Sequence, residues 1–169
     1  MTKKLRQIRI VGNLAYVPLT RGYEAIIDAA DVPMVAGFNW YAQVKLHTAY
    51  AVRNGYSGPN HREVRMHRTI MGEPDGMDVD HCDGDGLNNR RANLREATRK
   101  QNTHNQRTRS SNTSGFKGVT WHKAGGKWQA QIMMDGRKRH LGLFDTPEAA
   151  HEAYVSASKD LHGNFGRYE

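Results

Sequence analysis

An Asp-Gly dipeptide between two strand-like runs is the feature that most constrains how this chain can fold. Residues 127–134 and 137–144 read as strands, and Asp135-Gly136 joins them. Such a dipeptide between two strands is a strong local signal for a β-hairpin. A further run at 116–123 ends just before Gly125-Gly126, which marks another turn. We therefore predict a three-stranded antiparallel sheet in this part of the chain.

A capped helix is expected to follow this sheet. Thr146 is a suitable N-cap residue, and Pro147 favours the first helical position. Small and apolar side chains then recur along one helical face, at Ala150, Ala153, Tyr154, Ala157 and Leu161. Alternation in the middle strand places Trp128, Ala130 and Ile132 on one face of the sheet. We expect the helix to cover that face.

The opposite face of the sheet would then stay open. Alternation assigns to it Gln129, Gln131 and Met133. In the last strand, Lys138 and His140 would face one way, and Leu141 and Leu143 the other. An open sheet can enter a major groove, where Gln binds adenine and Lys binds guanine or phosphate. The alternative is a small α+β domain with an ordinary solvated face.

The residue string of this segment resembles the ethylene-response-factor DNA-binding domain of plants. The resemblance rests on Gly115-Phe116-Lys117-Gly118-Val119, Lys127-Trp128, the run from Leu141 to Ala150, and Ala153-Tyr154. That family reads DNA with its sheet, and the resemblance implies DNA contacts from Lys117, Thr120, His122, Gln131, Met133, Lys138 and His140. We expect Lys127 and Gln129 to contribute to the same surface. Several of these positions are Arg or Trp in the plant proteins, so their target sequence is not implied.

A second constraint is the polar composition of residues 76–106, which are dense in Asp, Asn, His and Arg. A segment this poor in apolar side chains is not expected to owe its order to a hydrophobic core. It is either flexible or a polar site. Asp80 and His81 would end a strand that begins near Met77, and a bend before Gly84 could aim both side chains to one side.

The residue types of this segment suit phosphodiester hydrolysis. Thr98 and Gln101 have capping-box spacing, which predicts a helix whose early turns include Asn102. The carboxylate of Asp80 and the amide oxygen of Asn102 are hard ligands that suit Mg²⁺. A neutral imidazole at His81 can accept a proton from water near pH 7. A nearby Asn or a backbone carbonyl could fix the orientation of that imidazole.

The string from Asp80 to Arg95 resembles the HNH endonuclease motif of the ββα-metal fold, in the branch of phage and intron-encoded homing endonucleases. Met66-His67-Arg68 and Gln101-Asn102 with Asn105 also match that branch. The resemblance implies that His81 is the general base and that Asn93 orients the His81 loop. It also implies that Asp80 and Asn102 bind Mg²⁺ or Mn²⁺. Arg99 is our candidate for contacting the scissile phosphate or the leaving group.

Zinc is the alternative metal, and it would recruit Cys82, His81, His67 and His104. The sequence holds no CxxC pair, and His81 and Cys82 are adjacent, which suits one tetrahedral site poorly. We therefore expect no zinc. We expect His67 to pack or form hydrogen bonds beside the site, whereas His47 and His61 are expected at the surface.

Charge and composition limit the partners. The net charge is +8; residues 1–98 hold 13 Lys and Arg against 11 Asp and Glu, and residues 99–169 hold 12 against 6. This excess suggests a polyanion, here double-stranded DNA. The single cysteine excludes a disulfide framework, and no apolar run approaches the ~20 residues that span a membrane. We expect a monomer on DNA in the cytoplasm of a bacterial host, with no membrane partner.

The predicted fold class is α+β, in four segments: a strand-rich region at 1–63, an HNH ββα-metal motif at 64–106, a linker at 107–113, and the ethylene-response-factor-like domain at 114–169. Within the first 71 residues we predict strands at 8–11, 14–18, 23–28, 40–45 and 48–53, helices at 31–38 and 64–71, and a loop at 54–60. Because hydrophobic residues make up only 37% of the chain, two or three small cores are expected.

The functional expectation is a site-selective, metal-dependent DNA endonuclease of the homing type. A single HNH centre per chain makes a cut in one strand the simpler outcome. The rival is a non-catalytic DNA-binding regulator whose HNH segment is a relic. A third reading, a non-specific degradative nuclease, has no need for a second DNA-binding module.

Overall fold

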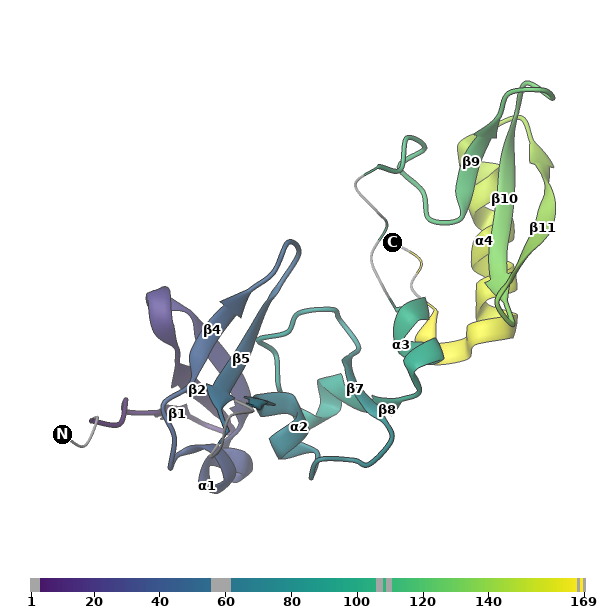
Figure 1. Ribbon diagram of the computed structural model, residues 1–169. Helices are drawn as coiled ribbons and strands as arrows, with labels where there is room; N and C mark the ends of the chain where they lie inside the picture. Colours follow the sequence, from purple (N-terminus) through teal and green to yellow (C-terminus); the bar gives the residue numbers. More distant parts are fainter. Residues whose placement is uncertain (1–3, 56–61, 106–107, 109–110, 167, 169) are drawn as a thin grey trace. The chain divides into compact units, whose positions relative to one another are not determined.

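The computed structural model has an α+β fold, as predicted, and divides into two compact units, Met1–Arg99 and Lys100–Glu169 (Figure 1). It describes residues 4–55, 62–105, 108, 111–166 and 168. Most of the predicted loop at 54–60, part of the predicted linker at 107–113, and His61 lie outside the described residues. The two units are treated separately below.

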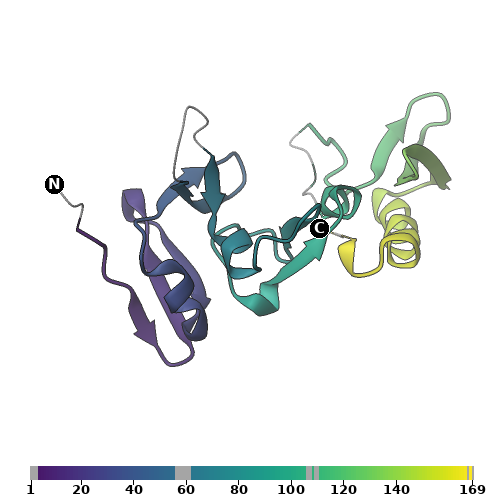
Figure 2. The same cartoon turned by 60° about the horizontal axis from the view of Figure 1, so that its bottom comes forward.

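The described part of Met1–Arg99 is built on three small antiparallel sheets (Figure 2). The first joins β1 (Arg9–Val11), β2 (Leu14–Pro18) and β3 (Glu24–Asp28). The second joins β4 (Tyr41–Val44), β5 (Ala49–Asn54) and β6 (Glu63–Arg65). In the third, β7 (Asp78–His81) pairs with β8 (Leu94–Ala97). The strands therefore lie close to their predicted places, except that β6 and β8 were not predicted.

The helices of this unit are shorter than the sequence suggested. η2 (Ala29–Asp31) and α1 (Val32–Val35) replace the predicted helix at 31–38, and α2 (Met66–Ile70) replaces the one at 64–71. Asp31 stands at the N-cap position of α1 without making a side-chain cap. Its buried carboxylate instead accepts hydrogen bonds from the guanidinium of Arg91. A charged donor forms a stronger hydrogen bond than a neutral backbone N–H. This explains why Asp31 binds the Arg91 guanidinium and does not cap α1.

The core of this unit draws on all three sheets and on both α-helices. Among its largest fully buried side chains are Trp40, Ile27 and Met66. Val79 and Leu94, from the polar segment 76–106, also belong to it. The expectation that this segment owes nothing to a hydrophobic core was therefore wrong. Val79 and Leu94 lie on paired strands and join this segment to the core. They stand fifteen positions apart in the sequence, so they give no local hydrophobic pattern.

The second unit contains the predicted sheet and helix. β9 (Val119–His122), β10 (Lys127–Met134) and β11 (Arg137–Phe144) form a sheet in the order β11-β10-β9. α4 (Pro147–His162) begins as predicted, because the Thr146 hydroxyl accepts from the Ala149 N–H at 3.2 Å. η4 (Gly163–Phe165) follows α4. α3 (Arg99–His104) starts at the boundary between the units.

α4 covers one face of this sheet, as expected. Val119, Ala130 and Ala150 are buried at the centre of the contact, with Trp128 and Phe144 packed around them. The buried stripe of α4 differs from the expectation at its C-terminal end. Leu161, which was expected to be part of the stripe, is exposed, whereas Ser158, which was not expected there, is fully buried. Across the described residues, no helix is long and apolar enough to cross a membrane.

A bulge in β11 changes which side chains reach the open face of the sheet. Ala130 pairs with Gly142 and Gln131 with His140, so Leu141 is the extra residue. Leu141 packs in the core, whereas Leu143 lies opposite Gln129 and is 41% exposed. The prediction that both leucines face the helix was therefore wrong for Leu143. A bulge inserts one residue and so reverses the alternation beyond it.

Candidate active site and DNA interface

The candidate active site is centred on the end of β7 and on the loop that joins it to β8. Asp80 and His81 are both buried, with 6% and 5% exposure. The Gly84 N–H donates to the His81 carbonyl at 2.9 Å, and the Cys82 N–H donates to the Asn93 carbonyl at 2.8 Å. The chain therefore turns directly after His81, where the sequence suggested a bend.

The imidazole of His81 is fixed by Asn89. His81 Nε2 lies 3.2 Å from Asn89 Oδ1, and the Asn89 side chain is fully buried. Asn89 Nδ2 donates to the Leu87 carbonyl at 3.1 Å, which assigns Oδ1 as the acceptor toward His81. The His81 hydrogen is thus assigned to Nε2 and the lone pair to Nδ1. Burial lowers the pKa of His81 and outweighs the Asn89 hydrogen bond and the nearby aspartates, which raise it.

Asn93 ties together the two ends of the loop. Its Oδ1 accepts from the Asp83 N–H at 3.1 Å, and its Nδ2 donates to Asp83 Oδ1 and to the Asn88 carbonyl. Burial raises the pKa of Asp83, but hydrogen bonds from the Asp85 N–H, Asn88 and Asn93 outweigh this and leave it below its usual value. Asn93 therefore holds Asp83 and Asn88 together within the loop, and its role in catalysis stays a prediction.

Asp80 forms an ion pair across the two-stranded sheet. It is the direct partner of Arg95 in the β7–β8 register. The Arg95 Nε and Nη2 groups lie 2.9 and 2.7 Å from Asp80 Oδ2, and both side chains are largely buried. Taking a carboxylate out of water is costly unless a charged donor accompanies it. Arg95 provides that donor and also orients the Asp80 oxygens.

Behind His81 lies an aromatic cluster. The His67 ring from α2 meets the His81 ring edge-on at 4.8 Å, and the Tyr50 ring from β5 lies 5.9 Å from each. Burial, followed by electrostatic effects of His81, Arg65 and Arg68, lowers the pKa of His67 to about 3. His67 is therefore neutral at physiological pH. The expectation that it packs beside the site was correct.

The first sheet of the N-terminal region supports the loop from one side. The Asn89 N–H donates to the Ile26 carbonyl at 2.7 Å, and the Ile26 N–H donates to the Leu87 carbonyl at 2.9 Å. The Arg91 N–H donates to Asp28 Oδ2 at 2.8 Å, next to the ion pair between Arg91 and Asp31. Residues 1–63, which the sequence presented as a separate region, therefore form part of the support of the site.

The second sheet supports the loop at Gly86. The Gly86 N–H donates to the Thr48 hydroxyl at 2.8 Å. A Cβ at Gly86 would lie 2.4 Å from the Ala49 carbonyl oxygen and 2.5 Å from the Tyr50 ring. Such contacts are too close for any side chain, so glycine is required there. β5 and the His81 loop therefore pack backbone to backbone.

The other predicted site residues lie on α3. Arg99 is its first residue, and Asn102 lies in its middle. Arg99 belongs to the first unit with Asp80, His81 and Asn93, whereas Asn102 belongs to the second. Among the described side chains, no group of three or more His, Cys, Asp or Glu is arranged to hold a metal ion. The predicted ligands are Asp80 and Asn102, and only Asp80 is of these four residue types. The absence of a group of three such residues among the described side chains therefore does not test this pair.

In the second unit, α3 contacts the module that follows it. Lys100 pairs with Asp135 at 2.5 Å, and the His104 and His162 rings stack at 3.6 Å. Lys117 Nζ donates to the His104 carbonyl at 2.7 Å, at the C-terminal end of α3. Lys117, predicted as a DNA contact, is therefore also a cap of this helix.

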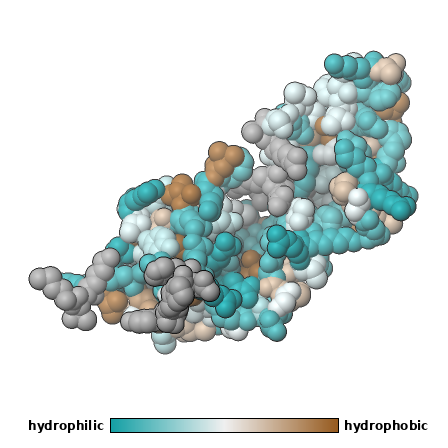
Figure 3. Space-filling model, viewed as in Figure 1, coloured by the Kyte–Doolittle hydropathy of each residue, from teal (hydrophilic) through white to brown (hydrophobic). Residues whose placement is uncertain are grey.

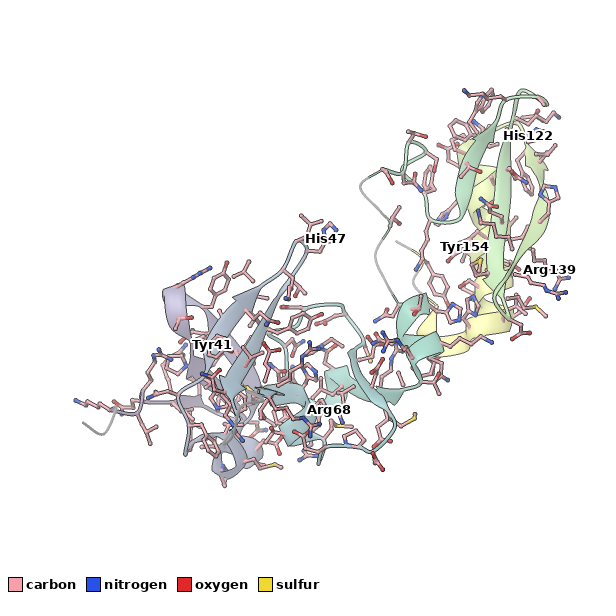
Figure 4. All side chains as sticks on the ribbon, in the orientation of Figure 1. Tyr41, His47, Arg68, His122, Arg139 and Tyr154 are labelled. Atoms are coloured by element: carbon pink, nitrogen blue, oxygen red, sulfur yellow. The ribbon has the colours of Figure 1, made fainter. Side chains whose placement is uncertain are left out.

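The open face of the sheet carries most of the other predicted DNA-binding positions, among them His122, which is labelled in Figure 4. Pairs directly opposite each other share a face, and Gln129 stands opposite Thr120, and Gln131 opposite His140. Gln129 Nε2 lies 2.9 Å from His140 Nδ1, and Lys127 pairs with Asp145 at 3.0 Å. The face as a whole comprises Thr120, His122, Lys127, Gln129, Gln131, Met133, Lys138, His140 and Leu143.

Comparison with known proteins gives matches to both parts. Residues 66–104 match the HNH endonuclease family model. Protein 3.8 of Escherichia phage T7 is 37% identical over 114 residues, which cover 67% of this chain and 93% of the phage protein. APETALA2-like protein 2 of Oryza sativa subsp. indica is 35% identical over 66 residues. The AP2-like ethylene-responsive transcription factor TOE2 of Arabidopsis thaliana is 38% identical over 53. No solved structure matches the chain.

These matches define a protein with an HNH endonuclease segment and an AP2-like segment. The chain belongs to the family of phage T7 Protein 3.8, nearly all of which it covers. It spans only 15% and 11% of the two plant proteins, with matches over 35% and 31% of its own length. The matches therefore support an AP2-like segment within this chain and do not extend to the rest of the plant proteins.

The neutral state of His67 gives a prediction about stability and pH. Between pH 6.5 and about 3, the unfolded chain binds a proton on His67 that the folded chain does not. Acidification in this window therefore favours unfolding, by about 1.4 kcal/mol per pH unit for one such group. The variant His67→Phe cannot titrate, so its free energy of unfolding should fall less steeply with acid.

Urea unfolding at several pH values between 6.5 and 4 would test this prediction. His47→Gln is the matched control, because His47 is exposed at a hairpin tip. The control should keep the wild-type slope. An unchanged slope in His67→Phe would contradict the assignment of a neutral buried His67.

Proposed function

We propose that this protein is a site-selective, metal-dependent DNA endonuclease of the homing type that cuts one strand at each encounter. The observation that carries the proposal is the hydrogen bond between His81 Nε2 and Asn89 Oδ1. It fixes the orientation of a neutral imidazole, which is the form that accepts a proton from water. The phage relative and the HNH match support a nuclease of a phage acting in its bacterial host.

His81 is the proposed general base. Its low pKa keeps the ring neutral, which is the form that accepts a proton. Asn89 and Asn93 have different positioning roles: Asn89 holds the ring and Asn93 holds the loop. We propose that Arg99, at the start of α3, contacts the scissile phosphate or the leaving group, because a guanidinium matches the geometry of phosphate oxygens.

We propose that Asp80 and Asn102 hold Mg²⁺ or Mn²⁺. The chemistry of Asp80 fits such an ion, because it is a buried carboxylate whose Oδ2 is fixed by Arg95. Asn102 offers a second hard oxygen of the kind that these ions prefer. A bound divalent cation would supply charge stabilisation for the developing oxyanion and the leaving oxygen. The zinc alternative is not favoured, since its thiolate would come from Cys82 alone.

We propose that the open sheet face of the second unit selects the site on double-stranded DNA. The AP2-like match and the side chains of Gln129, Gln131 and Lys138 support this division of labour. Gln can form paired hydrogen bonds with adenine, and Lys can bind guanine or phosphate. Positive charge is concentrated in the same part of the sequence, which favours association with a polyanion.

The first prediction of this proposal concerns His81→Ala. Nicking of supercoiled plasmid in Mg²⁺ should fall by roughly 10²–10⁴-fold, the usual contribution of a general base. Binding to the same DNA, measured by gel shift, should stay near the wild-type level because His81 acts on water. Wild-type nicking by the variant would remove His81 from this role. A wild-type chain that binds but never cuts would favour the regulator instead.

The second prediction concerns the metal ligands. Asp80→Ala and Asn102→Ala should each raise the Mg²⁺ concentration needed for half-maximal nicking, by about tenfold or more, or abolish nicking. Mn²⁺ binding followed by electron paramagnetic resonance should weaken in parallel. Asp75→Ala, at an exposed turn of the unit that contains Asp80, is the control. One tightly bound zinc per chain, found by elemental analysis, would overturn the Mg²⁺ assignment.

The third prediction concerns site selection. Gln131→Ala and Lys138→Ala should each reduce discrimination between preferred and random sites by about 1–3 kcal/mol. Lys123→Ala removes a charge from a turn of the same unit and should weaken binding to all sequences alike. Cleavage maps of full-length variants on one long substrate would compare them. An unchanged preferred site in both open-face variants would point away from this sheet as the reader.

A further inference from the structure

The hairpin of β4 and β5 ends in an exposed leucine. Leu46 is 84% exposed, the highest value among the large apolar side chains of the described residues. Lys45 and His47 flank it and are also exposed. The hairpin extends away from the body of its unit, with His47 labelled at its end in Figure 4 and hydrophobic surface at the same place in Figure 3. We refer to Lys45, Leu46 and His47 as the hairpin tip.

The turn itself does not account for these residues. The Lys45 N–H donates to the Thr48 carbonyl at 2.8 Å, so the strands remain paired up to Leu46 and His47. Two-residue hairpin turns favour Asn-Gly or Gly-containing pairs, which accept positive φ angles. Neither Leu46 nor His47 has a positive φ. The backbone of this turn therefore tolerates a leucine without demanding one, and its side chain is left in solvent, where it can contact a partner outside the chain.

The hairpin tip is attached closely to the candidate active site. Thr48, two residues from Leu46, accepts the Gly86 N–H of the His81 loop. The ring of Tyr50, two residues further on, lies tilted against the His81 ring at a centroid distance of 5.9 Å. Four residues of extended strand span about 14 Å at most. With the Tyr50 side chain and the distance between the rings added, the tip lies within about one helical turn of DNA from a bond that His81 serves.

We propose that the hairpin tip enters the minor groove beside the bond to be cut, with Leu46 inserted between two base pairs. This inference rests on the proposed function. Single apolar side chains that enter the minor groove separate stacked bases and kink the duplex. Only the end of the hairpin, with the Leu46 side chain, would enter this groove, which is about 6 Å wide. Lys45 and His47 stand on either side of Leu46, where they would meet the phosphates of the two strands.

Leu46, inserted between two base pairs as a wedge, gives the nuclease a way to distort the DNA near the bond to be cut. Unstacking one base step bends the backbone and exposes the phosphate on its outer side. The rigid seat of the hairpin on Gly86 fixes the distance between the distorted step and His81. The distortion and the cut therefore keep a constant spacing along the DNA.

The experiment uses the full chain and a duplex built around its mapped nicking site. Single 2-aminopurines are placed at successive positions on both sides of the nick, and fluorescence is read with the protein bound in EDTA. We expect one step within about one turn of the nick to brighten with wild-type protein and with Leu46→Met, but not with Leu46→Ser. Nicking by Leu46→Ser in Mg²⁺ should fall about tenfold or more.

Ile10→Ser is the matched control, because Ile10 is 57% exposed on β1 of the same unit. It should brighten the same step and nick like the wild type. An abasic site at the brightened step, which is already unstacked, should restore nicking by Leu46→Ser. Equal nicking by Leu46→Ser and Ile10→Ser, or no brightened step with wild-type protein that nicks, would overturn the wedge. Absence of nicking by the wild type would instead refute the proposed function.

Discussion

The hydrogen bond between His81 and a fully buried Asn89 is the contact around which the first unit is organised. A buried amide must satisfy its donors and its acceptor within the protein, because unsatisfied polar groups are costly. The Asn89 side chain does so through His81 and the Leu87 carbonyl, and the Asn89 backbone N–H donates to the Ile26 carbonyl. The candidate base is therefore connected to the edge of the first sheet through a single residue. The geometry of the imidazole depends on a strand more than fifty positions earlier in the sequence.

Local signals predicted the second unit well. The Asp135-Gly136 turn, the Thr146 cap and the spacing of Ala150 and Tyr154 all act between neighbours in sequence, and the sheet and helix appear where they were expected. The bulge at Leu141 was missed, because nothing in a short run distinguishes an inserted residue from a continuing strand. The metal-binding and base assignments followed from a resemblance and stay predictions.

The support of the candidate site could not be predicted, because it is made of long-range contacts. Arg95 meets Asp80 only because β8 pairs with β7, and β8 is a four-residue strand in a polar segment. Arg91 meets Asp31 across sixty positions of sequence. Asn89 stood in the quoted motif, yet composition and spacing do not distinguish it from Asn88, which binds Asp83. Such partners are defined by the tertiary fold.

The absence of a side chain at Gly86 has a consequence for how proteins of this kind can be recombined. The His81 loop and β5 touch along their backbones at that residue, and β3 is joined to the same loop at Ile26. A segment excised at residue 64, the predicted start of the HNH motif, would leave both supports behind. We therefore expect the stretch from the first sheet to β8 to fold as one unit. We expect a joint placed after β8 to preserve these contacts and a joint placed before it to remove them.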